Sequence, residues 1–310
     1  MASQRNHSAW WRRALPVLSL GTAAGLFAAS PASQAKPVEV DLKLVLATDV
    51  SGSINDEELG IEREGTAAAF ADAAVIKAIQ AGALGRIAVA ALDFSNPEAD
   101  KVTIDWHIIH DRATAMALAE TIRDTPRTPG RRTSVSSALE MGTLLLEASD
   151  ADIVSTRKVI DVSGDGPNNS GNPMMEIHDK TIAAGITVNG LPVMDDNANG
   201  YYPNLDKYYA ACVAGGKGAF VIAVHNYKDF TAGMRHKLIL EISQNDNGVK
   251  QARLAPAAPP RLLLKTAAET PTLPPAILHS GDNEFTGHCD IQGGGGGGYG
   301  GFGGFGNGRF

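Results

Sequence analysis

Blocks of hydrophobic and polar positions alternate along the chain and predict strands and helices in turn. Short apolar runs predict buried strands at residues 42–47, 86–94, 157–163, 186–193 and 219–224. Residues 101–109 alternate apolar and polar side chains, which is typical of a half-exposed strand near a sheet edge. Apolar positions at helical spacing predict helices at residues 55–80, 111–123, 133–148, 176–184, 205–213 and 230–242. This alternation predicts an α/β fold, with a doubly wound, mostly parallel sheet that carries helices on both faces.

The first of these strands ends in a group of polar residues. Asp49, Ser51 and Ser53 follow the apolar run with the spacing D-x-S-x-S. Ligands of open α/β sheets bind outside the carboxyl ends of the strands. Because all three side chains offer oxygen, the site favours Mg²⁺, ahead of Ca²⁺ or Mn²⁺, and argues against a structural zinc. A simpler alternative is that Ser53 or Asn55 caps the next helix, but this leaves Asp49 and Ser51 unexplained.

Two later loops carry further oxygen ligands. Thr133 opens a predicted helix after a loop rich in proline and glycine, and Asp165 follows the strand at 157–163 in a glycine-rich turn. Loops at the carboxyl ends of parallel strands lie at one edge of the sheet. We therefore expect the two loops to meet the D-x-S-x-S loop and form one metal site, with Asp49, Ser51, Ser53, Thr133 and Asp165 as its residues.

This pattern resembles the von Willebrand factor A (vWA) domain over about residues 38–245. In that family a D-x-S-x-S loop, a threonine from a middle loop and an aspartate after a later strand form a metal-ion-dependent adhesion site. The resemblance implies that the two serines and the threonine touch Mg²⁺ directly, while the two aspartates often act through water. It also implies a vacant coordination position that accepts a carboxylate from a partner protein. The segments VIDVSGDGPNN, VNGLP and GGKGAF further resemble a bacterial secreted vWA-like family whose function is unassigned.

Two features depart from the family pattern. Arg131 and Arg132 precede Thr133, where the family usually has small residues. They either lower the affinity for the cation or help to hold an incoming carboxylate. Asp161 lies inside the strand that leads to Asp165, and a buried carboxylate is costly unless it is hydrogen-bonded. We expect it to contact a neighbouring loop in a structural role.

The two ends of the chain differ in composition from the middle. Residues 1–35 combine Arg12 and Arg13 with a following apolar run and small residues at a cleavage position, which predicts a secretory signal peptide. The run is shorter than the roughly 20 residues of a membrane anchor. We expect a vWA-like domain at 36–250, an Ala/Pro-rich linker at 251–292 and a low-complexity Gly/aromatic tail at 293–310.

Charge and cysteine content limit the partners. The 310 residues include 27 basic and 34 acidic side chains, and removal of residues 1–35 takes away three of the basic ones. This acidic balance argues against nucleic acid or an anionic membrane as the main partner. Cys212 and Cys289 either form a disulfide in an oxidising compartment or stay free, with Cys212 buried.

These observations favour a periplasmic or secreted, metal-dependent protein-binding module without catalysis, which captures an Asp or Glu carboxylate of a partner. One alternative is a Mg²⁺-dependent hydrolase or phosphatase with Asp49 as its nucleophile. Aspartyl phosphatases have a second carboxylate two residues on, where this chain has Ser51. A second alternative is an assembly protein that acts through its Gly-rich tail.

Overall fold

The computed structural model describes residues 36–128, 130–194, 202–244, 277–279, 285 and 288–290. The chain divides into residues 1–36 and a unit of residues 37–310, and the helices and strands of the described residues all belong to the second unit. The expected signal peptide at 1–35, the expected tail at 293–310 and most of the expected linker at 251–292 lie outside the described residues.

A seven-stranded sheet forms the centre of the unit, in the order β4-β3-β2-β6-β7-β8-β9. Its strands are β2 (Lys43–Asp49), β3 (Ile87–Phe94), β4 (Lys101–Ile109), β6 (Lys158–Gly164), β7 (Thr187–Pro192), β8 (Phe220–Ile222) and β9 (Ile277–His279). Neighbours from β3 to β8 are parallel, whereas β4 and β9 pair antiparallel at the two edges. A separate parallel pair consists of β1 (Val38–Glu39) and β5 (Ile153–Val154). The mostly parallel α/β architecture expected from the sequence is confirmed.

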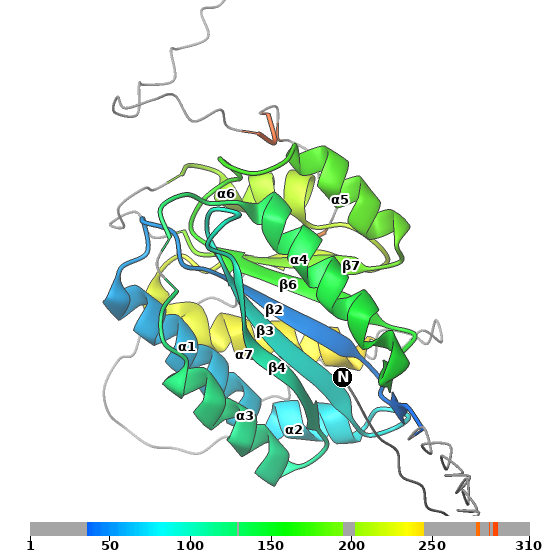
Figure 1. Cartoon of the computed structure of the whole chain (residues 1–310). Coiled ribbons are helices and arrows are strands. Elements are labelled where there is room, and N and C mark those ends of the chain that lie inside the picture. Colours follow the sequence, from blue (N-terminus) through cyan, green and yellow to red (C-terminus); the bar gives the residue numbers. More distant parts are fainter. Residues whose placement is uncertain are drawn as a thin grey trace, which may run out of the picture. The chain divides into compact units, whose positions relative to one another are not determined.

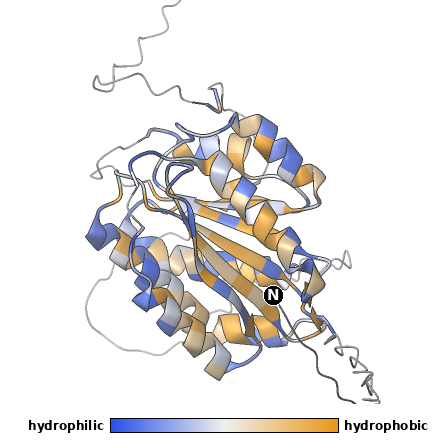
Figure 2. Ribbon diagram, in the orientation of Figure 1, coloured by the Kyte–Doolittle hydropathy of each residue, from blue (hydrophilic) through white to orange (hydrophobic). Residues whose placement is uncertain are grey.

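Helices cover both faces of the sheet (Figure 1). On one side lie α1 (Asp56–Ala71), α2 (Ala73–Gln80), α3 (Arg112–Asp124) and α7 (Phe230–Ser243), and on the other α4 (Val135–Ala148), α5 (Met174–Ala183) and α6 (Leu205–Tyr208). Strand β2 contributes side chains to the core on both faces of the sheet. Leu44 and Leu46 pack in the cluster that includes residues of α1 and α7, and Val45 and Ala47 pack in the cluster that includes residues of α4 and α5. Hydrophobic residues accordingly dominate the central strands (Figure 2). In the described part of the chain, no helix has the length and apolar character needed to cross a membrane.

Three local features differ from the expected elements. The single helix expected at 55–80 is two helices, because Asp72 leaves the helical conformation and accepts a hydrogen bond from the Ala74 amide, which caps α2. The helix expected at 205–213 continues beyond α6 as a π-helical turn, Tyr209–Val213. The range expected to be a linker contains β9, which pairs with β8, and a disulfide joins Cys289 to Cys212. A strand of three residues is too short to show a sequence pattern.

Candidate metal centre

The first loop of the candidate site begins at the end of β2. Asp49 is fully buried there, and its Oδ1 accepts a hydrogen bond from the Ser51 amide at 2.8 Å. The hydroxyl oxygens of Ser51 and Ser53 lie 3.1 Å apart. Asn55 caps α1, because its Oδ1 accepts from the Glu57 and Glu58 amides, so neither serine is used as the cap. The helix start therefore accounts for Asn55 but not for the D-x-S-x-S residues.

The other two loops meet this one, as the sequence predicts. Strand β6 pairs in parallel with β2, and Asp165, at its end, accepts a hydrogen bond from the Ser53 hydroxyl through Oδ1 at 2.8 Å. Thr133 lies beside the same turn, since a Cβ on Gly166 would lie 3.5 Å from its Oγ1. Thr133 is held by Asn169, whose amide donates to the Thr133 carbonyl and whose Oδ1 accepts from the Thr133 amide. A chain of contacts thus joins the three loops.

Asp49 and Asp165 are two buried carboxylates whose environment disfavours their charged forms. Asp49 Oδ2 and Asp165 Oδ2 are buried and accept no hydrogen bond from any described residue. Burial raises the pKa of Asp49 well above its usual range, and the neighbouring charge of Asp165 raises it further. Burial also raises the pKa of Asp165 to about 6, against the lowering effect of the Ser53 hydroxyl. Buried carboxylates are stabilised by a cation or by protons, so the site fits a divalent cation.

Within the described residues, no three His, Cys, Asp or Glu side chains gather closely enough to hold a metal ion. The candidate site relies instead on two carboxylates and three hydroxyls. This donor set suits a hard cation, and it differs from the nitrogen and sulfur ligands of structural zinc sites.

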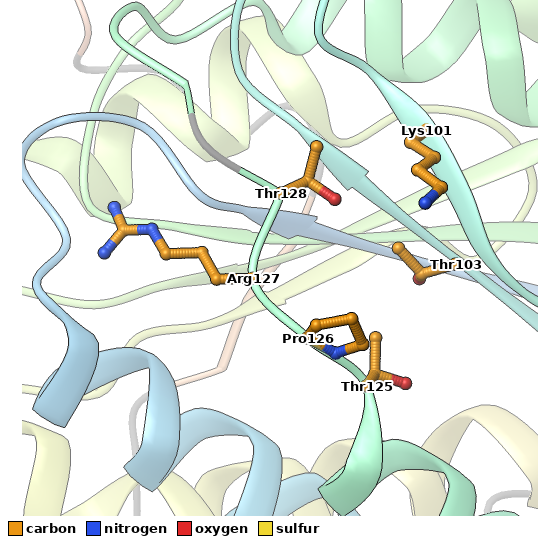
Figure 3. A pocket seen from close by; sticks show the side chains of 6 residues that line it. All are labelled: Lys101, Thr103, Thr125, Pro126, Arg127 and Thr128. Carbon is orange, nitrogen blue, oxygen red and sulfur yellow. The ribbon is translucent and has the colours of Figure 1, made fainter.

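Arg127 stabilises the first loop, a role that no sequence pattern indicates. Its Nη2 donates to the carbonyl oxygens of Ile54 at 2.6 Å and Ser51 at 3.1 Å, while its Nη1 forms an ion pair with Asp56 at 2.7 Å. Arg127 also lines a pocket of about 180 Å³ with Lys101, Thr103, Thr125, Pro126 and Thr128. Its guanidinium points away from Lys101 and Thr103 (Figure 3). The side chain therefore belongs to the support of the candidate metal loop.

Two further buried side chains near the aspartates, Glu62 and Tyr209, are not indicated as site residues by the sequence pattern. Glu62 of α1 is 1% exposed, and neither of its carboxylate oxygens has a hydrogen-bond partner among the described residues. Tyr209 is fully buried, and a Cβ on Gly164 would lie 3.0 Å from its Oη and 2.9 Å from Asp49 Oδ2. Glu62 sits in the middle of a helix at an ordinary spacing, so sequence alone could not distinguish it from a surface residue.

The residues that depart from the family pattern fall in two places. Arg131 and Arg132 are exposed beside the site; Arg132 donates to the Asn169 carbonyl at 3.4 Å. Asp161 is buried in β6 and forms an ion pair with Lys237. Its structural role was expected, but its partner is on helix α7 and not on a loop.

A family model described as "Protein of unknown function (DUF1194)" matches residues 39–246. A search of curated proteins finds no match.

The solved structures that are similar to this chain are distant from it in sequence. Proximal thread matrix protein 1 from the mussel byssus is 17% identical, with a TM-score of 0.47 over 67% of this chain and 49% of that one, and one of its structures has a zinc-occupied MIDAS motif. The pilus adhesin SpaC from Lactobacillus rhamnosus GG is 15% identical, with a TM-score of 0.47 over 67% and 31% of the two chains. A von Willebrand factor type A protein from Catenulispora acidiphila is 14% identical, with a TM-score of 0.46 over 66% and 43%. The matches therefore span half or less of these proteins.

Proposed function

The chain belongs to the family described as "Protein of unknown function (DUF1194)", and from the geometry of its site we propose that it is a metal-dependent protein-binding module. The observation that carries the proposal is the pair of buried carboxylates, Asp49 and Asp165, each with one unpartnered oxygen among the described residues and each beside a hydroxyl-bearing loop. A vWA-like α/β fold holds these loops at the carboxyl end of its central strands.

The metal that we propose is Mg²⁺, with Mn²⁺ or Ca²⁺ as alternatives. Ser51, Ser53 and Thr133 would bind it directly, and Asp49 and Asp165 would supply negative charge. Mg²⁺ tolerates few carboxylate ligands and keeps several waters. A bound cation supplies an electrophilic position for an acidic group from outside.

The partner that we propose is a protein that offers an Asp or Glu carboxylate. The exposed guanidinium groups of Arg131 and Arg132 lie on the loop that carries Thr133, which supports this choice. Arginine pairs readily with carboxylates because its planar group donates two parallel hydrogen bonds. Of the two roles considered for these arginines, we therefore favour a part in holding the incoming acidic segment.

We propose a binding role and not catalysis because of the setting of Asp49. A phosphoryl-transfer nucleophile has to reach its substrate, but Asp49 is 0% exposed and one of its oxygens accepts from the Ser51 amide. Ser51 stands where a second carboxylate would assist such an enzyme.

We also propose that the protein works in the periplasm or outside the cell. Disulfides persist in oxidising compartments, and Cys212 and Cys289 are joined. The signal peptide expected at residues 1–35 agrees with this location.

The test is a calorimetric titration of Mg²⁺ and Mn²⁺ into the chelator-treated protein. We expect saturable one-site binding that Asp49→Ala abolishes, whereas Asp124→Ala, at an exposed aspartate of α3, leaves it unchanged. Acidic peptides should then bind the wild-type protein with Mg²⁺ and dissociate when chelator is added. Absence of cation binding in the wild type would refute the proposal.

A further inference from the structure

The C-terminal segment contacts the domain close to the candidate metal centre. A disulfide joins Cys289 to Cys212, 77 residues earlier in the chain. The hydroxyl of buried Tyr208 donates a hydrogen bond to the Cys289 carbonyl at 2.9 Å. Phe285 stacks edge-on against the Tyr208 ring, with the ring centroids 5.8 Å apart. The described residues of this segment are therefore fixed by covalent, polar and aromatic contacts.

Asp290 carries these contacts to the loop that follows Asp165. Its Oδ1 accepts hydrogen bonds from Asn168 Nδ2 at 3.1 Å and from the Met174 amide at 2.9 Å. Met174 is the first residue of α5, whose N-terminal amides lack partners within the helix and favour a negative charge. Tyr208 adds a second contact, since its oxygen accepts from the Asn168 amide at 2.9 Å. Asn168 thus depends on the C-terminal segment through its side chain and on Tyr208 through its backbone.

Asn168 in turn connects to the Thr133 loop. It is 2% exposed, and its Oδ1 accepts a hydrogen bond from the Ser136 amide at 3.1 Å, in the first turn of α4. The next residue, Asn169, binds Thr133 through its backbone and its side chain. A continuous series of hydrogen bonds therefore runs from Asp290 to the loops that carry Asp165 and Thr133.

We propose that Asp290 and the Cys212–Cys289 disulfide position the metal centre and set its affinity for the cation. The inference rests on the proposed metal-binding function. The C-terminal segment holds Asn168, and Asn168 holds the two ligand loops in register. A disulfide keeps such a segment near its contacts at a high effective concentration, and without the link the segment is free to leave.

The disulfide makes this arrangement sensitive to reduction. A dithiol reductant transfers two electrons and two protons to the S–S bond, which gives the thiols of Cys212 and Cys289, and the reductant is oxidised to its own disulfide. Release of the segment then removes Asp290 as the acceptor for two donors, the side-chain Nδ2 of Asn168 and the backbone amide of Met174 at the start of α5. The affinity for the cation falls as the loops lose their common support.

The first experiment compares Mg²⁺ affinity among aspartate variants of the full chain. We expect Asp290→Ala to raise the Kd about tenfold, whereas Asp290→Asn, which keeps an acceptor oxygen, recovers most of the affinity. Asp179→Ala removes an exposed carboxylate on α5, the helix whose N-terminus Asp290 contacts; it serves as the matched control and leaves the Kd unchanged. A lower unfolding temperature in Asp290→Ala with an unchanged Kd would show a merely structural role and overturn the inference.

The second experiment titrates Mg²⁺ into the oxidised, dithiol-treated and reoxidised wild-type protein. Reduction should raise the Kd about tenfold, and reoxidation should restore it. Equal affinity in all three states would overturn the redox part while leaving the proposed metal site intact. Failure of the oxidised wild type to bind any divalent cation would instead refute the proposed function and this inference with it.

Discussion

At the scale of single residues, Gly164 leaves space that Asp49 needs. A Cβ at this position would lie 2.9 Å from Asp49 Cβ and Oδ2 and 3.0 Å from Tyr209 Oη, closer than normal packing allows. We therefore expect Gly164→Ala to displace the Asp49 side chain and weaken Mg²⁺ binding at least tenfold by calorimetry. The matched control is Gly60→Ala in α1, where a Cβ meets nothing within 4 Å. It should stabilise the helix by roughly 0.5–1 kcal/mol and leave cation binding unchanged. Equal effects of the two substitutions on binding would contradict this account.

Glu62 is the residue whose protonation should affect stability. Burial raises its pKa well above the usual range of a glutamate, and the charges of Asp49 and Asp165 raise it further. Glu58 also raises it, and Arg63 opposes the shift. Above the unfolded-state pKa the unfolded chain releases this proton while the folded protein keeps it. The free energy of unfolding therefore loses a contribution as pH rises toward the folded-state pKa.

The substitution Glu62→Gln removes this titration. In chelator, we expect the unfolding temperature of the variant to gain on the wild type between pH 5 and pH 8, with the difference largest at the higher pH. Thermal unfolding followed by circular dichroism at several pH values measures it. Glu57→Gln, at an exposed carboxylate of the same helix, is the control. Parallel pH profiles for the wild type and Glu62→Gln would show that Glu62 is charged or compensated in the folded state.

At the scale of elements, helix α7 is attached to the sheet by a buried charge. Lys237 is fully buried and forms an ion pair with Asp161 of β6. Glu241 lies one turn further along α7, with its Oε1 3.7 Å from Lys237 Nζ. Removal of one partner of a buried pair leaves the other charge uncompensated and typically costs about 3–5 kcal/mol. We expect Lys237→Met to destabilise the protein by that amount in urea unfolding.

Two further variants identify the cause. Lys228→Met removes an exposed lysine just before α7 and should change the free energy of unfolding by less than about 0.5 kcal/mol. Addition of Asp161→Asn to Lys237→Met should recover part of the loss, because one of the two carboxylates that had faced Lys237 is gone. A loss that the second substitution does not reduce would indicate packing, and not charge, as the source of the effect.

The sequence predicted those elements whose signal is local. The apolar run of β2 and the D-x-S-x-S residues after it lie next to each other, so the strand and the first loop could be recognised together. The break between α1 and α2 at Asp72 has no proline or glycine to mark it. Arg127 was missed for another reason: its partners are backbone carbonyls more than 70 residues away in the chain. Contacts of this kind arise only when the loops are brought together by the folded sheet.

At the scale of the whole molecule, the two edges of the sheet differ. Strand β4 has β3 on one side and forms one edge, whereas β8 is covered by β9, which comes from residues 277–279. An unpaired edge strand offers its amides and carbonyls to other chains, so β9 protects β8 from pairing with a second molecule. The disulfide at Cys289 adds a covalent link later in the same C-terminal segment. The C-terminal segment thus contributes to the sheet although it follows the part matched by the family model.

Two truncations test this contribution. A chain that ends at residue 250 loses β9 and Cys289, and loss of a native disulfide typically costs about 2–5 kcal/mol. We expect a lower unfolding temperature and, because the β8 edge is open, a greater tendency to self-associate by size-exclusion chromatography. A chain that ends at residue 292 keeps β9, the disulfide and Asp290, and should unfold at the temperature of the full chain. If both truncations behave like the full chain, β9 contributes nothing to stability. If both lose stability equally, the contribution comes from residues beyond 292 and not from the strand.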